Sequence, residues 1–171
     1  AFSPFRVSII MSLVYIGLGA NLDQPQQQLE QALIELAKLE NSTLVAQSSL
    51  YHSKPVGPQD QPDYVNAVAL LETSLQPLAL LDALQQLEQD HGRIRKRHWG
   101  ERTLDLDIIL IDDQIIASER LNVPHPFAQQ RSFVLYPLSE INPQLVFPDG
   151  IALEQLLTEL DNDLIRIIKN T

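Results

Sequence analysis

Residues 104–111 constrain the fold most, because two carboxylates interrupt a run that is otherwise entirely apolar. An apolar run of this length predicts a buried β-strand. Successive side chains of a strand point to opposite faces, so Asp105 and Asp107 share one face about 7 Å apart, and their leucine and isoleucine neighbours point to the other. One face of this strand must therefore pack into a core while the other carries charge.

The rest of the chain alternates between strand and helix patterns. Further strands are predicted at residues 14–19, 43–51 and 65–73 with a short pairing strand at 115–116, and amphipathic helices at 25–39 and 77–91. The order strand, helix, strand, strand, helix, strand is typical of an α+β fold with a ferredoxin-like split βαβ core. We expect an antiparallel-containing sheet with the helices packed on one face, and a small C-terminal appendage of short helices from residue 124.

A cationic loop precedes the strand with the two carboxylates. Residues 93–102 hold five of the 12 Lys and Arg residues, although the net charge of the chain is −10. Carboxylates can hold a hard cation while guanidinium groups bind the phosphate oxygens that the cation leaves free, so the segment is suited to a Mg²⁺–polyphosphate. A solvated charge run beside a solvated strand end is the alternative, and the adjacency of the two features favours the metal site.

Two other groups of residues could recognise a ligand. Asn66 offers a donor and an acceptor to a planar heterocycle, and Tyr64 or Phe133 could stack on its ring, although such aromatic residues are more often core. His125 lies between two prolines, and a structural turn is its simplest interpretation. The segment 17–21, GLGAN, is not a dinucleotide-binding fingerprint, because Leu22 stands where the third glycine is required.

Composition excludes several classes of protein. The acidic balance argues against nucleic-acid and anionic-membrane partners. The absence of cysteine excludes disulfides, zinc–thiolate sites and thiol nucleophiles, and fits a cytoplasmic protein. The apolar stretch after Arg6 has the outline of a signal peptide but is too short to span a bilayer. We expect Met11 to be the natural start, residues 1–10 to be an extension or a cloning remnant, and residues 11–171 to form a single domain.

Three longer segments identify a family. VGPQDQPDYVNAV, GRIRKRHWGERTLDLDIIL and RLNVPHPFAQQRSFVLYPL, in this order, closely resemble 6-hydroxymethyl-7,8-dihydropterin pyrophosphokinase, an enzyme of folate biosynthesis. The resemblance implies transfer of a pyrophosphoryl group from ATP to the pterin hydroxymethyl oxygen, with release of AMP, by a protein we expect to be a monomer. The chain departs from the family pattern at Lys54, in place of a proline, and in a loop between Arg95 and Trp99 that is one residue shorter.

The resemblance also implies roles for individual residues. Two Mg²⁺ ions would be held by Asp105 and Asp107, which act in catalysis together with Arg93 and Arg102. The implied ATP contacts are Gln85, Glu88, Arg95, Arg120, His125 and Arg131. The implied pterin contacts are Ser53, Val56, Gly57, Tyr64, Asn66, Trp99 and Phe133.

Two other functions remain possible from the residues alone. A different two-metal phosphoryl or nucleotidyl transferase would share the carboxylate pair but have another acceptor. A non-catalytic ferredoxin-like binding module, for instance for RNA, would share the fold, although the acidity of the chain and the lack of a basic-aromatic sheet face argue against it.

Overall fold

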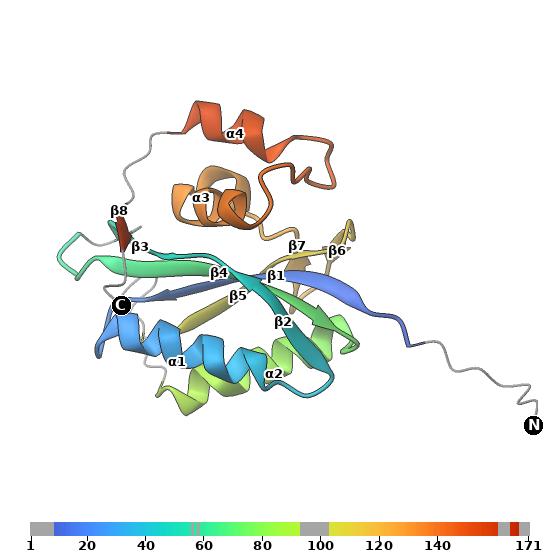
Figure 1. The fold of residues 1–171 in the computed structure, drawn as a ribbon, viewed down its shortest axis with the longest axis horizontal. Helices are drawn as coiled ribbons and strands as arrows, with labels where there is room; N and C mark the ends of the chain where they lie inside the picture. The colour runs from blue at the N-terminus through green and yellow to red at the C-terminus, as the bar shows by residue number, and fades with distance from the viewer. Residues whose placement is uncertain (1–8, 56, 58, 93–102, 161–164, 168–171) are drawn as a thin grey trace, which may run out of the picture.

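The computed structural model describes residues 9–55, 57, 59–92, 103–160 and 165–167, which form a main sheet with helices on both sides and a small second sheet (Figure 1). Its elements are β1 (Ser12–Ala20), α1 (Pro25–Ala37), β2 (Ser42–Gln47), β3 (Leu50–Ser53), β4 (Tyr64–Thr73), α2 (Pro77–Asp90), β5 (Asp105–Ile111), β6 (Ile116–Ala117), β7 (Asn122–Val123), the 3₁₀ turn η1 (Ala128–Gln130), α3 (Ser132–Ile141), α4 (Leu153–Glu159) and β8 (Ile165–Ile167). Among these, no helix is both long and apolar enough to cross a membrane.

The main sheet has the strand order β5-β1-β4-β3-β8, and β2 pairs with β4 beside β3. Every pairing between the described strands is antiparallel. Strand β4 lies between β1 and the strands that follow α1, which is the split βαβ arrangement expected from the order of elements. The α+β, ferredoxin-like prediction is confirmed. The strands β6 and β7 form a separate two-stranded ladder.

The predicted strand at 43–51 is two strands, because the pairing with β4 breaks at Ser48 and Ser49. Ser48 bridges the break: its N–H donates to the Val68 carbonyl at 2.8 Å, and its Oγ accepts from the Val68 N–H at 2.9 Å. The side chain thus replaces a backbone partner of β4. The sequence pattern missed this break because polar serines are equally compatible with a continuous edge strand.

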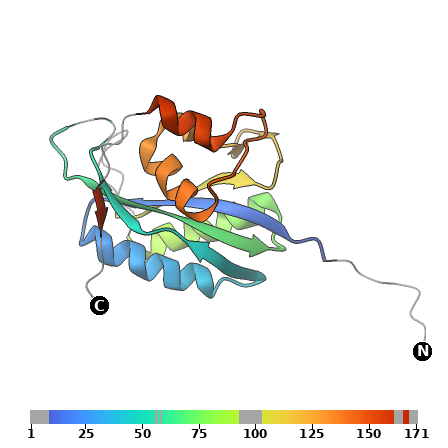
Figure 2. The same ribbon diagram turned by 45° about the horizontal axis from the view of Figure 1, so that its top comes forward.

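Each face of the sheet has its own core. On one face, Val14, Ile16 and Leu18 of β1 pack with buried leucines of α1 and α2. On the other, Tyr15 of β1 and Ile109 of β5 pack with residues of α3 and α4. Figure 2 shows the two helix pairs on opposite sides of the sheet. The predicted helices α1 and α2 do share a face, and the C-terminal appendage covers the opposite face, a position that the sequence pattern did not specify.

Candidate active site

The sheet brings the predicted metal-binding and heterocycle-binding residues into one row. In the register of the sheet, Gly19 of β1 lies opposite Asp105 of β5 on one side and opposite Asn66 of β4 on the other. Gly17 likewise lies opposite Asp107. Residues directly opposite in a ladder project to the same face. The two carboxylates and the Asn66 amide therefore project from the same face and are separated by β1, which has glycine at the two positions beside them.

Gly19 has no side chain, so only backbone lies between Asp105 and Asn66. A Cβ at this position would lie 3.1 Å from Asn66 Nδ2, closer than most side-chain contacts. A Cβ at Gly17 would lie 3.2 Å from Ile109 Cδ1. The glycines at alternate positions thus leave room for a ligand to lie against β1 between the carboxylates and the amide.

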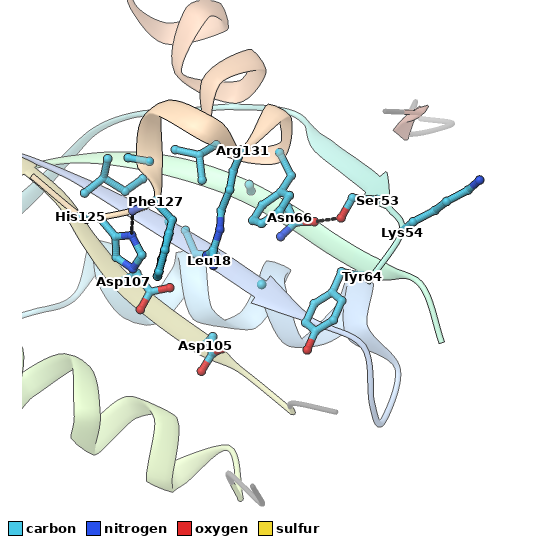
Figure 3. Close-up of a pocket in the computed structure, with 17 residues that line it drawn as sticks. Leu18, Ser53, Lys54, Tyr64, Asn66, Asp105, Asp107, His125, Phe127 and Arg131 are labelled. Carbon is cyan, nitrogen blue, oxygen red and sulfur yellow. Dashed lines mark hydrogen bonds between the residues drawn. The ribbon is translucent and has the colours of Figure 1, made fainter. Parts of the chain in front are cut away.

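A cavity of about 240 Å³ opens above the row (Figure 3). Its lining comes from β1, β3, β4, β5 and the segment from His125 to α3. The lining includes Gly17, Gly19, Ser53, Lys54, Tyr64, Asn66, Asp105, Asp107, His125, Phe127, Arg131 and Phe133. The cavity is the part of the described molecule that combines buried polar groups with charges of both signs.

The Asn66 amide is oriented by β3. Ser53 Oγ donates a 2.5 Å hydrogen bond to Asn66 Oδ1, and both residues are buried. Because the hydroxyl occupies Oδ1, the Nδ2 end of the amide is directed into the cavity, as Figure 3 shows. Ser53 thus orients the Asn66 amide through its side chain.

Arg131 enters the cavity from the opposite wall. Its guanidinium carbon lies 5.0 Å from the ring centroid of Phe127 and 5.5 Å from that of Phe133. Burial lowers the pKa of Arg131, while Asp107 and then Asp105 raise it. An arginine remains cationic despite such a shift. The side chain is therefore a permanent positive charge, supported by two aromatic faces and within the electrostatic field of both carboxylates.

His125 lies beside Asp107 at the end of the cavity away from Tyr64 (Figure 3). The Phe127 N–H donates to His125 Nδ1 at 3.2 Å. Burial, and then the charge of Arg131, lower the pKa of His125, so the neutral ring prevails at neutral pH. With Nδ1 as acceptor, the neutral ring carries its proton on Nε2, which is then a hydrogen-bond donor for a ligand oxygen.

This assignment predicts a pH dependence. In an NMR titration, His125 should titrate below the ordinary value of 6.5. Because the unfolded chain binds this proton more readily than the folded protein, the contribution of His125 to the free energy of unfolding should fall as pH drops below about 6.5. His125→Gln should weaken that dependence, and His52→Gln, at an exposed position of β3, serves as the control. A midpoint at or above 6.5 would contradict the assignment.

The carboxylate pair fits a hard cation. Oxygen ligands suit Mg²⁺, which commonly takes only one or two carboxylates and completes its shell with water and phosphate. Within the described ranges, no group of three or more His, Cys, Asp or Glu side chains could hold a metal. A cation held by Asp105 and Asp107 would take its remaining ligands from water and phosphate oxygens, as Mg²⁺ commonly does.

Several predicted site residues lie away from the cavity. Arg120 Nη2 lies 2.5 Å from Asp82 Oδ1 and 3.4 Å from Gln85 Oε1, on an exposed part of α2. Glu88 is 4% exposed, and its Oε2 accepts a 2.9 Å hydrogen bond from the Leu106 N–H, between the two aspartates. Gly57 has a φ of 110° in an exposed loop. The other predicted residues lie outside the described part of the chain: Val56, Arg93, Arg95, Trp99 and Arg102.

The cavity lining also contains residues to which the sequence analysis gave no role in the site, among them Gly17, Gly19, Lys54 and Phe127. The sequence could have revealed the glycines: positions i and i+2 of a strand share a face, so Gly17 and Gly19 leave one face of the strand without side chains. The proline-rich segment around Phe127 gave no such signal, although its ring lies 5.0 Å from the guanidinium carbon of Arg131, only four residues further along the chain. Lys54 lines the mouth of the cavity, but its side chain points away from the other labelled residues (Figure 3).

The α+β fold, the paired carboxylates and the half-buried cation of Arg131 suit an enzyme that transfers a phosphorus-containing group. Residues 15–143 match the family model described as 7,8-dihydro-6-hydroxymethylpterin-pyrophosphokinase (HPPK). This chain belongs to that family. Membership confirms the predicted family and enzyme class, pyrophosphoryl transfer to a hydroxymethyldihydropterin, and excludes a non-catalytic binding module.

Named relatives agree with the family match. The chain is 55% identical over 150 residues to a 2-amino-4-hydroxy-6-hydroxymethyldihydropteridine pyrophosphokinase from Haemophilus influenzae, covering 88% of this chain and 91% of the relative. It is 52% identical over 144 residues to the Pseudomonas aeruginosa protein of that name, covering 84% and 89%. A Plasmodium falciparum HPPK-DHPS variant crystallised with pteroate has a TM-score of 0.71 at 13% identity, covering 88% of this chain and 41% of that one. That structural likeness supports the fold.

Proposed function

We propose that the cavity binds ATP and 6-hydroxymethyl-7,8-dihydropterin together, so that the pyrophosphoryl group of ATP passes to the pterin hydroxymethyl oxygen and AMP leaves. The row from Asp105 through Gly19 to Asn66 carries this proposal. Neighbouring strands lie about 4.8 Å apart, so roughly 10 Å of backbone separates the carboxylate from the amide. A heterocycle held at Asn66 can therefore extend its hydroxymethyl group towards the carboxylates.

The pterin end of the cavity lies between β3, β4 and α3. Asn66 Nδ2 donates to a ring acceptor, and Ser53 fixes the amide in that orientation. The aromatic rings of Tyr64 and Phe133 provide stacking surfaces in the same cavity. Val56, Gly57 and Trp99 complete the proposed pterin set by their position in the family motifs.

The ATP end lies between β5 and the segment that carries His125 and Arg131. His125 donates from Nε2 to a phosphate or ribose oxygen, and Arg131 supplies charge to the phosphates. The proposed ATP set further contains Gln85, Glu88, Arg93, Arg95, Arg102 and Arg120. Arg120 can join it only by leaving its ion pair with Asp82.

Phosphoryl transfer depends on alignment of the two substrates and neutralisation of phosphate charge more than on covalent catalysis by the protein. Asp105 and Asp107 would hold two Mg²⁺ ions, which when bound neutralise phosphate charge and polarise the reacting oxygens. The chain itself holds the two substrates in line across β1. Arg131, Arg93 and Arg102 balance the negative charge that develops during transfer.

We further propose that residues 11–171 form a single pyrophosphokinase domain that acts as a cytoplasmic monomer, without nucleic-acid or membrane partners. Its support is the acidic net charge of −10 together with a family match that runs unbroken from residue 15 to 143. A different two-metal transferase would lack a reason for the buried Ser53–Asn66 pair beside the carboxylates.

The division into two subsites is tested by Asn66→Ala. The variant should weaken pterin binding by about 1–3 kcal/mol, because the ring loses a buried hydrogen-bond partner. ATP affinity measured without pterin should hardly change. Calorimetry with pterin and a non-hydrolysable ATP analogue gives both values, and Asn122→Ala, at an exposed position of β7, is the control. Equal losses for the two ligands would remove Asn66 from the pterin site.

A further inference from the structure

Glu140, near the end of α3, accepts hydrogen bonds from both Ser49 and Tyr51 and lies outside the cavity. The Ser49 N–H lies 2.8 Å from Oε1 and 2.9 Å from Oε2 of its carboxylate. Ser49 Oγ donates to Oε2 at 2.8 Å, and Tyr51 Oη donates to Oε1 at 3.1 Å. Hydrogen bonds to an ionised acceptor are the strong class, so one side chain joins α3 to the sheet.

Ser49 and Tyr51 lie at and beside the break between β2 and β3. Ser49 sits in the break between β2 and β3, where the ladder with β4 is interrupted. Backbone groups in such a break lack ladder partners and need others. Ser48 satisfies the side towards β4 through Val68, and Glu140 satisfies the Ser49 N–H on the other side. The break is therefore held between β4 and α3.

Both ends of this connection lead to the proposed pterin site. On the sheet, Tyr51 lies directly opposite Asn66, and two residues further along β3 Ser53 orients the Asn66 amide. On the helix, Phe133 lies seven residues before Glu140, about 10 Å along the axis. Helix α3 packs against both β3 and β4. The carboxylate thus ties the element that carries Phe133 to the strand that fixes Asn66.

We propose that Glu140 is a positioning residue that sets the separation of α3 from β3 and thereby the width of the cavity between Phe133 and Asn66. The inference rests on the proposed function, because that part of the cavity is the pterin end. Glu140 is not among the residues that line the cavity. It acts through Tyr51 and Ser49 on one side and through α3 on the other.

The first experiment measures whether the connection exists. In Glu140→Ala, amide hydrogen exchange of Tyr51, His52 and Ser53 should accelerate about tenfold, as expected when one or two hydrogen bonds that close the edge are lost. Glu140→Gln should fall between wild type and Ala, since an amide has one acceptor oxygen for the three donor groups of Ser49 and Tyr51. Glu119→Gln, at an exposed position between β6 and β7, should leave exchange unchanged. Wild-type exchange in Glu140→Ala overturns the proposal, whatever the activity.

The second experiment measures its consequence. With a non-hydrolysable ATP analogue bound, Glu140→Ala should weaken pterin binding about tenfold and raise the pterin KM, while kcat and ATP affinity measured alone stay within about twofold. In a cycle with Tyr51→Phe, the two losses should not add, because both variants break the same contact. Faster exchange with unchanged pterin affinity would make Glu140 merely structural and overturn the positioning role. A wild-type protein that binds no pterin would instead refute the proposed substrate, and with it the role of Glu140 in the pterin site.

Discussion

Replacing Asp105 or Asp107 by alanine should lower turnover at least about a thousandfold, because a bound cation contributes several kcal/mol of charge stabilisation in phosphoryl transfer. Each variant removes one of the two carboxylates that the structure places on the cavity face of β5. The loss should appear in AMP formation at saturating ATP and pterin. Raising the Mg²⁺ concentration should restore only part of the turnover, because each variant lacks one of the two carboxylates that bind the metal.

The fold should survive these changes. The alternate residues Leu106 and Ile108, which pack against α1 and α2, hold β5 in the core and are untouched. Asp107 is exposed and Asp105 half-buried, and exposed ion pairs contribute little, so the free energy of unfolding should change by less than about 1 kcal/mol. Urea denaturation of each variant and the wild type measures this change in the free energy of unfolding.

Asp113→Ala is the matched control for the carboxylate pair. Asp113 is an exposed aspartate in the turn that follows the same strand and lies outside the cavity lining. It should retain wild-type activity at every Mg²⁺ concentration. Near-normal turnover in either Asp105→Ala or Asp107→Ala would refute the metal-site assignment, whereas a loss shared by Asp113→Ala would point to general damage to the strand end.

The local part of this architecture was predictable because it depends on periodicity. Alternation along β5 placed both aspartates on one face, and apolar spacing located α1 and α2 within a few residues. The order of elements then fixed the split βαβ sheet. The site residues on strands, such as Asn66, followed because strand register turns sequence spacing into spatial neighbours.

The parts that were missed depend on contacts between distant segments. An amphipathic pattern shows that α3 has an apolar side but not which face of the sheet it covers, so Arg131 was predicted as a site residue but its place on a wall beside Phe127 was not. The break at Ser48 and Ser49 is stabilised by Val68 and Glu140, 20 and 91 residues away in sequence. Strand propensity carries no information about partners at such separations.

Arg131, on the cavity wall that also carries Phe127, is the second position at which substitution should greatly reduce activity. Arg131→Ala should reduce kcat/KM by about 10²–10³-fold, the usual effect of removing one preorganised group that stabilises developing charge. Arg131→Lys should recover little of it. A lysine keeps the charge, but it lacks the planar guanidinium that lies over Phe127 and Phe133 and that can bind phosphate oxygens in pairs.

The aromatic support can be separated from the charge. Phe127→Leu keeps an apolar side chain but removes one ring from Arg131, and should cost several-fold in kcat/KM, corresponding to about 1 kcal/mol for a partly buried cation–π contact. In the Arg131→Ala background the same change should have almost no further effect, because the ring then supports nothing. Lys38→Ala, at the exposed end of α1, is the control for loss of a cation. If Phe127→Leu weakened the Arg131→Ala enzyme as much as the wild type, Phe127 would contact substrate directly rather than hold the arginine in place.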